Sequence, residues 1–154
     1  MSNWKQILLR EARKKGMCGD YLEPLTLCGD KITAIGLYMS EPKWALTHDY
    51  PTLDELREYF ALYGTEGLYI DRMFADKLLD EHMCYVLHNC SGTIRTGLNA
   101  VQAIIPDIHI AHGCNLVIKS EGPSVQIEIH VYGEDNVVKT EGTSTFRIHK
   151  HDTD

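Results

Sequence analysis

The fold of this chain is decided by two stretches, GCNLVIKSEGPS at 113–124 and GEDNVVKTEGTS at 133–144. They lie twenty residues apart, and six of the twelve aligned positions are identical. The identical pairs are Gly113 and Gly133, Val117 and Val137, Lys119 and Lys139, Glu121 and Glu141, Gly122 and Gly142, and Ser124 and Ser144. A repeat near twenty residues is the size of one coil of a β-solenoid, in which each coil stacks on the previous one.

The repeat has two interpretations. In a solenoid, each coil would turn at glycine or asparagine, which tolerate a positive φ, and would present β-branched residues to the next coil. In an antiparallel sandwich or meander, the two stretches would share only their turn chemistry. Parallel stacking in register with the repeat would place Val117 beside Val137 on neighbouring strands, and an antiparallel ladder would not.

The C-terminal part of the chain is rich in predicted strands. From Met83 onward apolar and polar residues alternate with a period of two, and Gly, Asn and Pro separate the runs. A further short strand is expected at 68–70, whereas 75–82 is ambiguous between helix and strand. The main expected strands are 83–88, 92–96, 103–111, 115–120, 124–132, 136–140 and 144–149.

The N-terminal part is predicted to be helical. Apolar residues three or four positions apart predict a first helix, which ends at Gly16. The stretch 17–30 contains Gly and Pro and is predicted to be an ordered loop or a series of short turns. Asp30 is expected to cap a second helix, which Pro42 ends. The apolar stripe of the first helix consists of Trp4, Ile7, Leu8 and Ala12.

A third helix is expected at about 52–63. Thr52 and Glu55 form a capping box, in which each side chain accepts a hydrogen bond from an unpaired backbone N–H at the helix start. Gly64 then supplies the left-handed residue that commonly follows a helix.

Together these elements predict an α+β fold with two subdomains. The helical N-terminal subdomain, 1–66, would be a cap packed over the open end of a β-solenoid-like repeat subdomain, 67–154. Solenoids need such caps, because an open terminal coil exposes apolar side chains and unpaired strand edges. An antiparallel β-sandwich or meander remains the alternative for the C-terminal part.

Composition excludes several classes of function. The net charge of −7 argues against a general nucleic-acid binder, because such proteins neutralise phosphates with Lys and Arg. No run approaches the roughly 18 apolar residues of a membrane span, and the N-terminus has no apolar signal region. Five cysteines, without a secretory signal, indicate free thiols in a reducing compartment. We therefore expect a cytoplasmic protein whose partner, if any, is another protein or a second copy of itself.

One cluster of residue types invites a metal hypothesis. Histidines and cysteines that lie an even number of positions apart would have their side chains on the same face of a strand, where they could bind one Zn²⁺ ion together. The candidates are His82, Cys84, His88 and Cys90, with His112 and Cys114 in the same pattern further on. Ligands two or four positions apart on a strand are roughly 7 or 13 Å apart, however, and no C-x₂-C knuckle is present. Packed core cysteines are the alternative, and the sequence implies no cofactor.

Other catalytic candidates have no local signature. Cys18 and Cys84 are the nucleophile candidates, although nothing nearby in the sequence indicates an activating base. Paired carboxylates for glycoside hydrolysis could come from Asp76, Asp80 and Glu81, or from Glu121 and Glu141, but such charges are usually on solvated faces.

The C-terminal half resembles uncharacterised proteins of gut Bacteroidetes and their phages. The resemblance rests on HNCSGTIRTGLNAVQAIIPDIHIAHGC at 88–114 and on VYGEDNVVKTEGTSTFRI at 131–148. Proteins of this kind often join a helical start to β-helix-like coils. The resemblance therefore implies a phage or mobile-element origin, and it implies no activity and no functional residue.

Two hypotheses of function follow. The first is a non-enzymatic structural or interaction module, in which the β part is a rigid scaffold. The second is a small-molecule or metal-dependent enzyme with its site at the junction between the helices and the strands. Four aromatic residues could line a pocket there, namely Tyr59, Tyr63, Tyr69 and Tyr85.

Overall fold

The structure is a computed structural model that describes residues 4–61, 65–99 and 103–154. Five helices form the N-terminal part, and a short 3₁₀ turn, η1 (Thr65–Gly67), leads from them into the strands. The helices are α1 (Trp4–Lys14), α2 (Gly19–Leu27), α3 (Lys31–Ser40), α4 (Pro42–Thr47) and α5 (Leu53–Tyr59). We call α1–α5 and their connections the helical cap.

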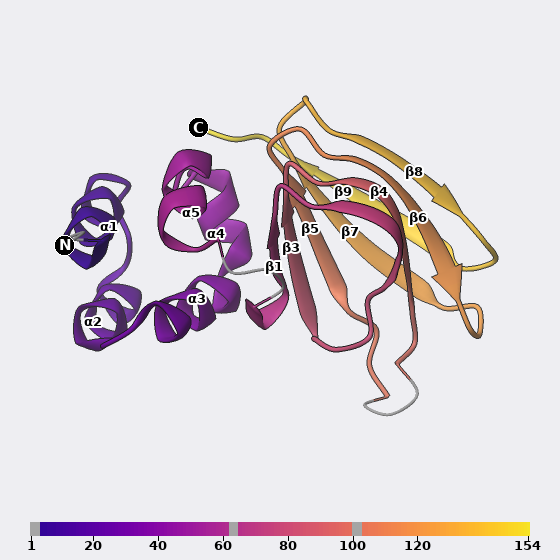
Figure 1. The fold of residues 1–154 in the computed structure, drawn as a ribbon, viewed down its shortest axis with the longest axis horizontal. Coiled ribbons are helices and arrows are strands. Elements are labelled where there is room, and N and C mark those ends of the chain that lie inside the picture. Colours follow the sequence, from indigo (N-terminus) through magenta and orange to yellow (C-terminus); the bar gives the residue numbers. More distant parts are fainter. Residues whose placement is uncertain (1–3, 62–64, 100–102) are drawn as a thin grey trace.

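The rest of the chain contributes strands alternately to two sheets, and the strands within each sheet are parallel (Figure 1). The five-stranded sheet has the order β1-β3-β5-β7-β9, and the four-stranded sheet has the order β2-β4-β6-β8. Because successive strands alternate between the sheets and their ladders are parallel, the chain forms a β-solenoid of about four coils, which confirms the predicted fold class. The strands are β1 (Leu68–Ile70), β2 (Met73–Leu78), β3 (Cys84–His88), β4 (Ser91–Gly97), β5 (Asp107–Ala111), β6 (Asn115–Glu121), β7 (Gln126–Tyr132), β8 (Val137–Glu141) and β9 (Thr145–His151).

The strands stack at a different offset from the one that the repeat suggests. Val117 lies beside Lys139, twenty-two residues further on, and not beside Val137. The strand β6 begins two residues after Gly113, whereas β8 begins four residues after Gly133. The repeat therefore marks the corners of the solenoid. Because the corner after Gly133 is two residues longer than the corner after Gly113, β8 is shifted by two residues relative to the repeat.

Glycine and asparagine shape these corners. Gly113 and Gly133 have φ values of 82° and 86°, which side chains rarely adopt. The Asn136 side-chain oxygen accepts the backbone N–H groups of Gly113 and Cys114 at 3.1 and 2.9 Å, and its amide donates to the Tyr132 carbonyl at 2.9 Å. One amide side chain thus ties two neighbouring coils together.

Apolar columns fill the interior of the solenoid. Ile108, Ile129 and Ile148 lie in register on β5, β7 and β9. The first two are completely buried, whereas Ile148, in the last coil, is 42% exposed. The stack therefore presents an open end at β8 and β9.

The helical cap lies along the outer face of the five-stranded sheet (Figure 1). A second hydrophobic core fills this contact, and four successive strands of the sheet contribute to it. The contributing side chains are Leu68 and Ile70 of β1, Val86 of β3, Ala111 of β5 and Tyr132 of β7. A cap packed on the solenoid is thus confirmed, but its expected position is wrong, because the helices cover the side of the stack.

The predicted helix starts are confirmed. The Asp30 carboxylate accepts the Thr33 N–H at 2.7 Å and caps α3. The capping box of Thr52 and Glu55 begins α5, which ends at Tyr59, before the predicted end.

The stretch predicted to be a loop contains a helix instead. Residues Gly19–Leu27 form α2 with Pro24 inside it. A proline within the helix removes one intrahelical hydrogen bond, and the contact of Leu25 with the helical core compensates for this loss. No helix within the described residues is long and apolar enough to cross a membrane.

Candidate functional site

A chain of four hydrogen-bonded side chains lies where the helical cap meets the five-stranded sheet. The Tyr38 hydroxyl is 2.7 Å from His88 Nε2, and His88 Nδ1 is 2.8 Å from His112 Nδ1. His112 Nε2 is 2.7 Å from the Asp49 carboxylate. We call these four residues the junction chain.

The parallel register brings the two histidines together. His88 ends β3 and pairs with Ala111 of β5, so His112, the next residue, stacks on the His88 ring at 5.0 Å between centroids. His112 and Asp49 both have left-handed backbone conformations, with φ of 61° and 49°.

The positions of the protons in the junction chain follow from Asp49, the residue at one of its ends. The Asp49 carboxylate only accepts, and the hydrogen bond from His112 keeps the pKa of Asp49 below its usual value. His112 therefore donates from Nε2 and accepts at Nδ1, whereas His88 donates from Nδ1 and accepts the Tyr38 hydroxyl at Nε2. Burial lowers the pKa of His88 to about 3 and raises the pKa of Tyr38, so both are neutral at physiological pH.

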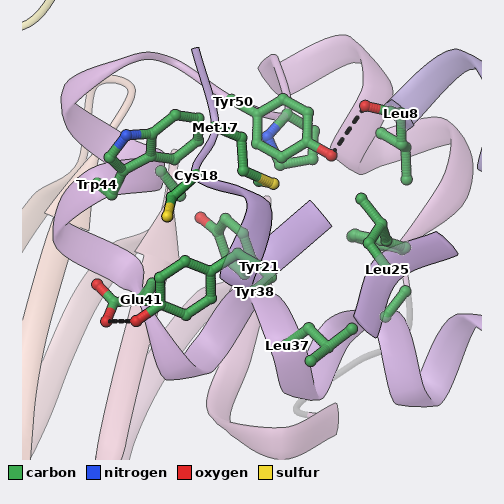
Figure 2. A pocket seen from close by; sticks show the side chains of 14 residues that line it. Leu8, Met17, Cys18, Tyr21, Leu25, Leu37, Tyr38, Glu41, Trp44 and Tyr50 are labelled. Atoms are coloured by element: carbon green, nitrogen blue, oxygen red, sulfur yellow. Dashed lines mark hydrogen bonds between the residues drawn. The ribbon is translucent and has the colours of Figure 1, made fainter. Parts of the chain in front are cut away.

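An apolar cavity of about 110 Å³ lies in the helical cap, at the Tyr38 end of the junction chain. Figure 2 shows side chains from separate helices around this space. This pocket is partly open to solvent, and its volume is close to that of an apolar cavity known to bind benzene, about 150 Å³, so its size matches a small ring or a short alkyl chain. The lining residues are Leu8, Met17, Cys18, Tyr21, Leu25, Ala34, Leu37, Tyr38, Glu41, Trp44, Ala45, Tyr50, Pro51 and Phe60.

Most polar groups in the cavity lining already have partners. The Tyr21 hydroxyl donates to the Glu41 carboxylate (Figure 2), and the Tyr50 hydroxyl donates to the Leu8 carbonyl at 3.0 Å. Cys18 has an exposed free thiol and therefore offers a chemical handle on the lining. The cavity thus offers apolar surface with few unpaired polar atoms.

A second cavity, of about 140 Å³, lies at the other end of the junction chain. Its lining is more polar and includes three carboxylates, those of Asp49, Asp135 and Asp154, together with His112. His88 connects the two regions and has no exposed surface. The junction chain thus runs from an apolar cavity to a polar one through buried imidazole.

The four predicted metal candidates do not converge. His82 precedes β3, and Cys84 and His88 lie on the outer face of the five-stranded sheet, but Cys90 belongs to the solenoid interior. The alternation of faces ends at Asn89, where φ is 52° and the chain turns a corner. Among the described residues, no group of three or more His, Cys, Asp or Glu is arranged to hold a metal ion.

The other catalytic candidates are also spread over the fold. Cys18 lines the apolar cavity, and burial raises the pKa of Cys84 to about 11, the opposite of an activated thiolate. Tyr59 packs in the helical core, Tyr69 and Tyr85 pack inside the solenoid, and Tyr63 lies outside the described residues. These tyrosines therefore do not form the expected common pocket.

Four of the five candidate carboxylates form ion pairs with basic residues of the four-stranded sheet, and Glu81 pairs with Lys77 at 3.9 Å. Arg95 bridges Asp76 at 2.9 Å and Glu121 at 2.5 Å, and Lys119 lies 3.9 Å from Glu141. The ion pairs of Arg95 and Lys119 connect neighbouring strands, and their exposed groups have the arrangement of a solvated face.

A column of histidines follows the outer face of the five-stranded sheet beyond the helical cap. His109, His130 and His149 lie in register on three successive strands, with ring centroids 4.7 and 4.6 Å apart. His130 Nδ1 is also hydrogen-bonded to His151 Nε2 at 2.9 Å, and His149 Nε2 is hydrogen-bonded to the Glu128 carboxylate at 2.5 Å.

Sequence reasoning found His88 and His112 but missed Tyr38 and Asp49. The contacts of these two residues span 50 and 63 positions of the chain. No local motif encodes them, because they depend on how the helical cap lies against the sheet.

The chain was compared with family models, curated proteins and solved structures, and none of them matches it.

Proposed function

We propose that this protein is a non-enzymatic binding module for a small, largely apolar molecule, with the β-solenoid as its scaffold. The observation that carries the proposal is the apolar cavity of about 110 Å³ in the helical cap. A concave, mostly apolar pocket with a few polar groups on its lining is the usual form of a small-molecule binding site.

The scaffold supports the proposal because it keeps the cavity open. The helices around the cavity are short, the longest having eleven residues, and isolated helices of this length are marginal in water. Their shared core with four strands of the sheet holds them in place. A parallel stack of coils supplies a rigid wall for that purpose.

The energetics favour a ligand of one ring or of similar size. Burying a side chain as large as Leu or Phe contributes roughly 1.5–3 kcal/mol, and a ligand that fills the cavity gains a comparable or somewhat larger amount. We therefore expect a bare ring such as toluene to bind with a dissociation constant on the order of 1 mM.

Calorimetric titration with toluene tests the proposal. We expect saturable binding, accompanied by a change in Trp44 fluorescence, because Trp44 lines the cavity. The variant W44F should lose the fluorescence change, whereas W4F should keep it, because Trp4 packs on the helical core and is not part of the cavity lining.

Alkylation of Cys18 provides a second measurement that does not alter a packed side chain. A bulky thiol reagent at this exposed residue should weaken toluene binding, and C18S should be insensitive to the reagent. Absence of saturable binding up to the solubility limit of toluene would contradict the proposed function.

A further inference from the structure

We propose that the junction chain couples the apolar cavity to a proton, so that proton uptake at His112 turns the Tyr38 hydroxyl into a donor for a ligand's acceptor atom. This inference rests on the proposed function and deepens it. The ligand class becomes a small apolar molecule with one hydrogen-bond acceptor, and its affinity rises as the pH falls.

The three hydrogen bonds of the junction chain all point in the same direction. Tyr38 donates to His88, His88 donates to His112, and His112 donates to Asp49. Each imidazole has both nitrogens occupied, one as donor and one as acceptor. The chain therefore holds three protons, and all of them are directed toward Asp49.

A fourth proton cannot be added without reversing part of the chain. If His112 becomes an imidazolium, its Nδ1 carries a proton that faces the Nδ1 proton of His88, 2.8 Å away. His88 must then change tautomer, accepting at Nδ1 and donating from Nε2 to the Tyr38 oxygen, 2.7 Å away. One proton is taken from water, none is released, and the added charge lies on His112 beside the Asp49 carboxylate.

The surroundings favour the charge on His112 over His88. His112 and Asp49 are partly exposed, whereas His88 is completely buried, and its burial opposes ionisation. Other charges near the chain are Lys15, close to Asp49, and Asp71, close to His88. The titratable groups that share the polar cavity or contact it are Asp49 before α5, Asp135 between β7 and β8, and Asp154 with its partner His48.

The reversal changes what the cavity offers a ligand. Tyr38 now receives a hydrogen bond from His88, and its own proton needs another acceptor. The lining is mostly apolar, and Glu41 already accepts the Tyr21 hydroxyl, so a ligand acceptor atom gives the buried Tyr38 donor a partner. A net hydrogen bond of this kind corresponds to an affinity gain of up to about tenfold.

Nuclear magnetic resonance of the histidine side chains tests the reversal in the unaltered protein. Two-bond nitrogen–proton correlations report which nitrogen of His88 is protonated. Spectra at about pH 8 and about pH 6 are compared, and we expect the proton on Nδ1 at the higher pH and on Nε2 at the lower pH. A His88 that keeps its Nδ1 proton at both pH values overturns the inference.

Ligand titrations at the same two pH values test the coupling. Toluene has no acceptor, so its dissociation constant should stay constant, whereas that of benzonitrile should fall by up to about tenfold at the lower pH. The variant Y38F should bind both probes without pH dependence. The matched control H149Q alters a histidine that contacts Glu128 and His130, away from the junction chain, and should keep the dependence.

The outcomes separate the two proposals. Failure of both probes to bind at either pH overturns the proposed function. Binding of both probes with the same response to pH overturns the coupling and leaves the proposed function standing.

Discussion

Replacing Ile129 with alanine should destabilise the protein far more than the same replacement at Ile148. Both side chains belong to one interior column and lie in register on neighbouring strands. Ile129 has no exposed surface, whereas Ile148 is 42% exposed. A buried Ile-to-Ala change removes contacts on all sides and leaves a cavity, which costs about 3 kcal/mol within a general range of roughly 2–5 kcal/mol.

The loss at Ile148 should be about 1 kcal/mol, because this side chain packs on a coil on one side only and leaves no enclosed cavity. Urea denaturation followed by circular dichroism measures both values, with the two slopes compared to verify that the unfolding transition is the same. Equal losses at the two positions would show that the last coil is covered in solution. They would refute the conclusion that the stack has an open end.

Two further predictions concern acid stability and the helical cap. Burial holds the pKa values of His88 and His109 at about 3, so unfolded histidines bind protons below about pH 6.5 and the native ones do not. As the pH is lowered from about 6.5 to about 3, the free energy of unfolding should therefore decrease by about 1.4 kcal/mol per pH unit for each of the two histidines. Urea titrations at several pH values measure this slope, and the variant H109Q should have a smaller slope. Removal of residues 1–64 should expose the apolar side chains on the outer face of the five-stranded sheet, so we expect the remaining fragment to aggregate. Size-exclusion chromatography measures this, and a monomeric fragment that folds cooperatively would contradict the prediction.

The sequence predicts the strands of this protein well because their signals are local. Alternation and corner glycines place seven strands within a few residues of their observed positions, the largest difference being the start of β5 at Asp107. The offset between strands is not local information, because it depends on how many residues each corner contains. The helix at Gly19–Leu27 was missed because Pro24 lies inside it and the surrounding stretch 17–30 also contains Gly19 and Gly29, whereas burial of Leu25 stabilises it.

The site is less predictable than the fold. His88 and Cys90 lie two positions apart, so a continuous strand would place both side chains on one face. The turn at Asn89 breaks this alternation, and His88 therefore faces the helical cap whereas Cys90 faces the solenoid interior. The pairing of His88 with His112 follows only from the register of β3 and β5, which the sequence leaves open. The two remaining members of the junction chain come from the helical cap, whose position on the side of the stack was not predicted.

The histidine column on the five-stranded sheet limits how much charge this face can carry. Two imidazolium rings at the 4.7 Å spacing of His109 and His130 would repel each other by roughly 3–4 kcal/mol at an effective dielectric constant of about 20. Ionisation of one ring therefore suppresses ionisation of the rings directly above and below it. Burial also holds the pKa of His109 at about 3, so the inner end of the column stays neutral in mild acid, and the spacing between strands limits the charge that this face can carry.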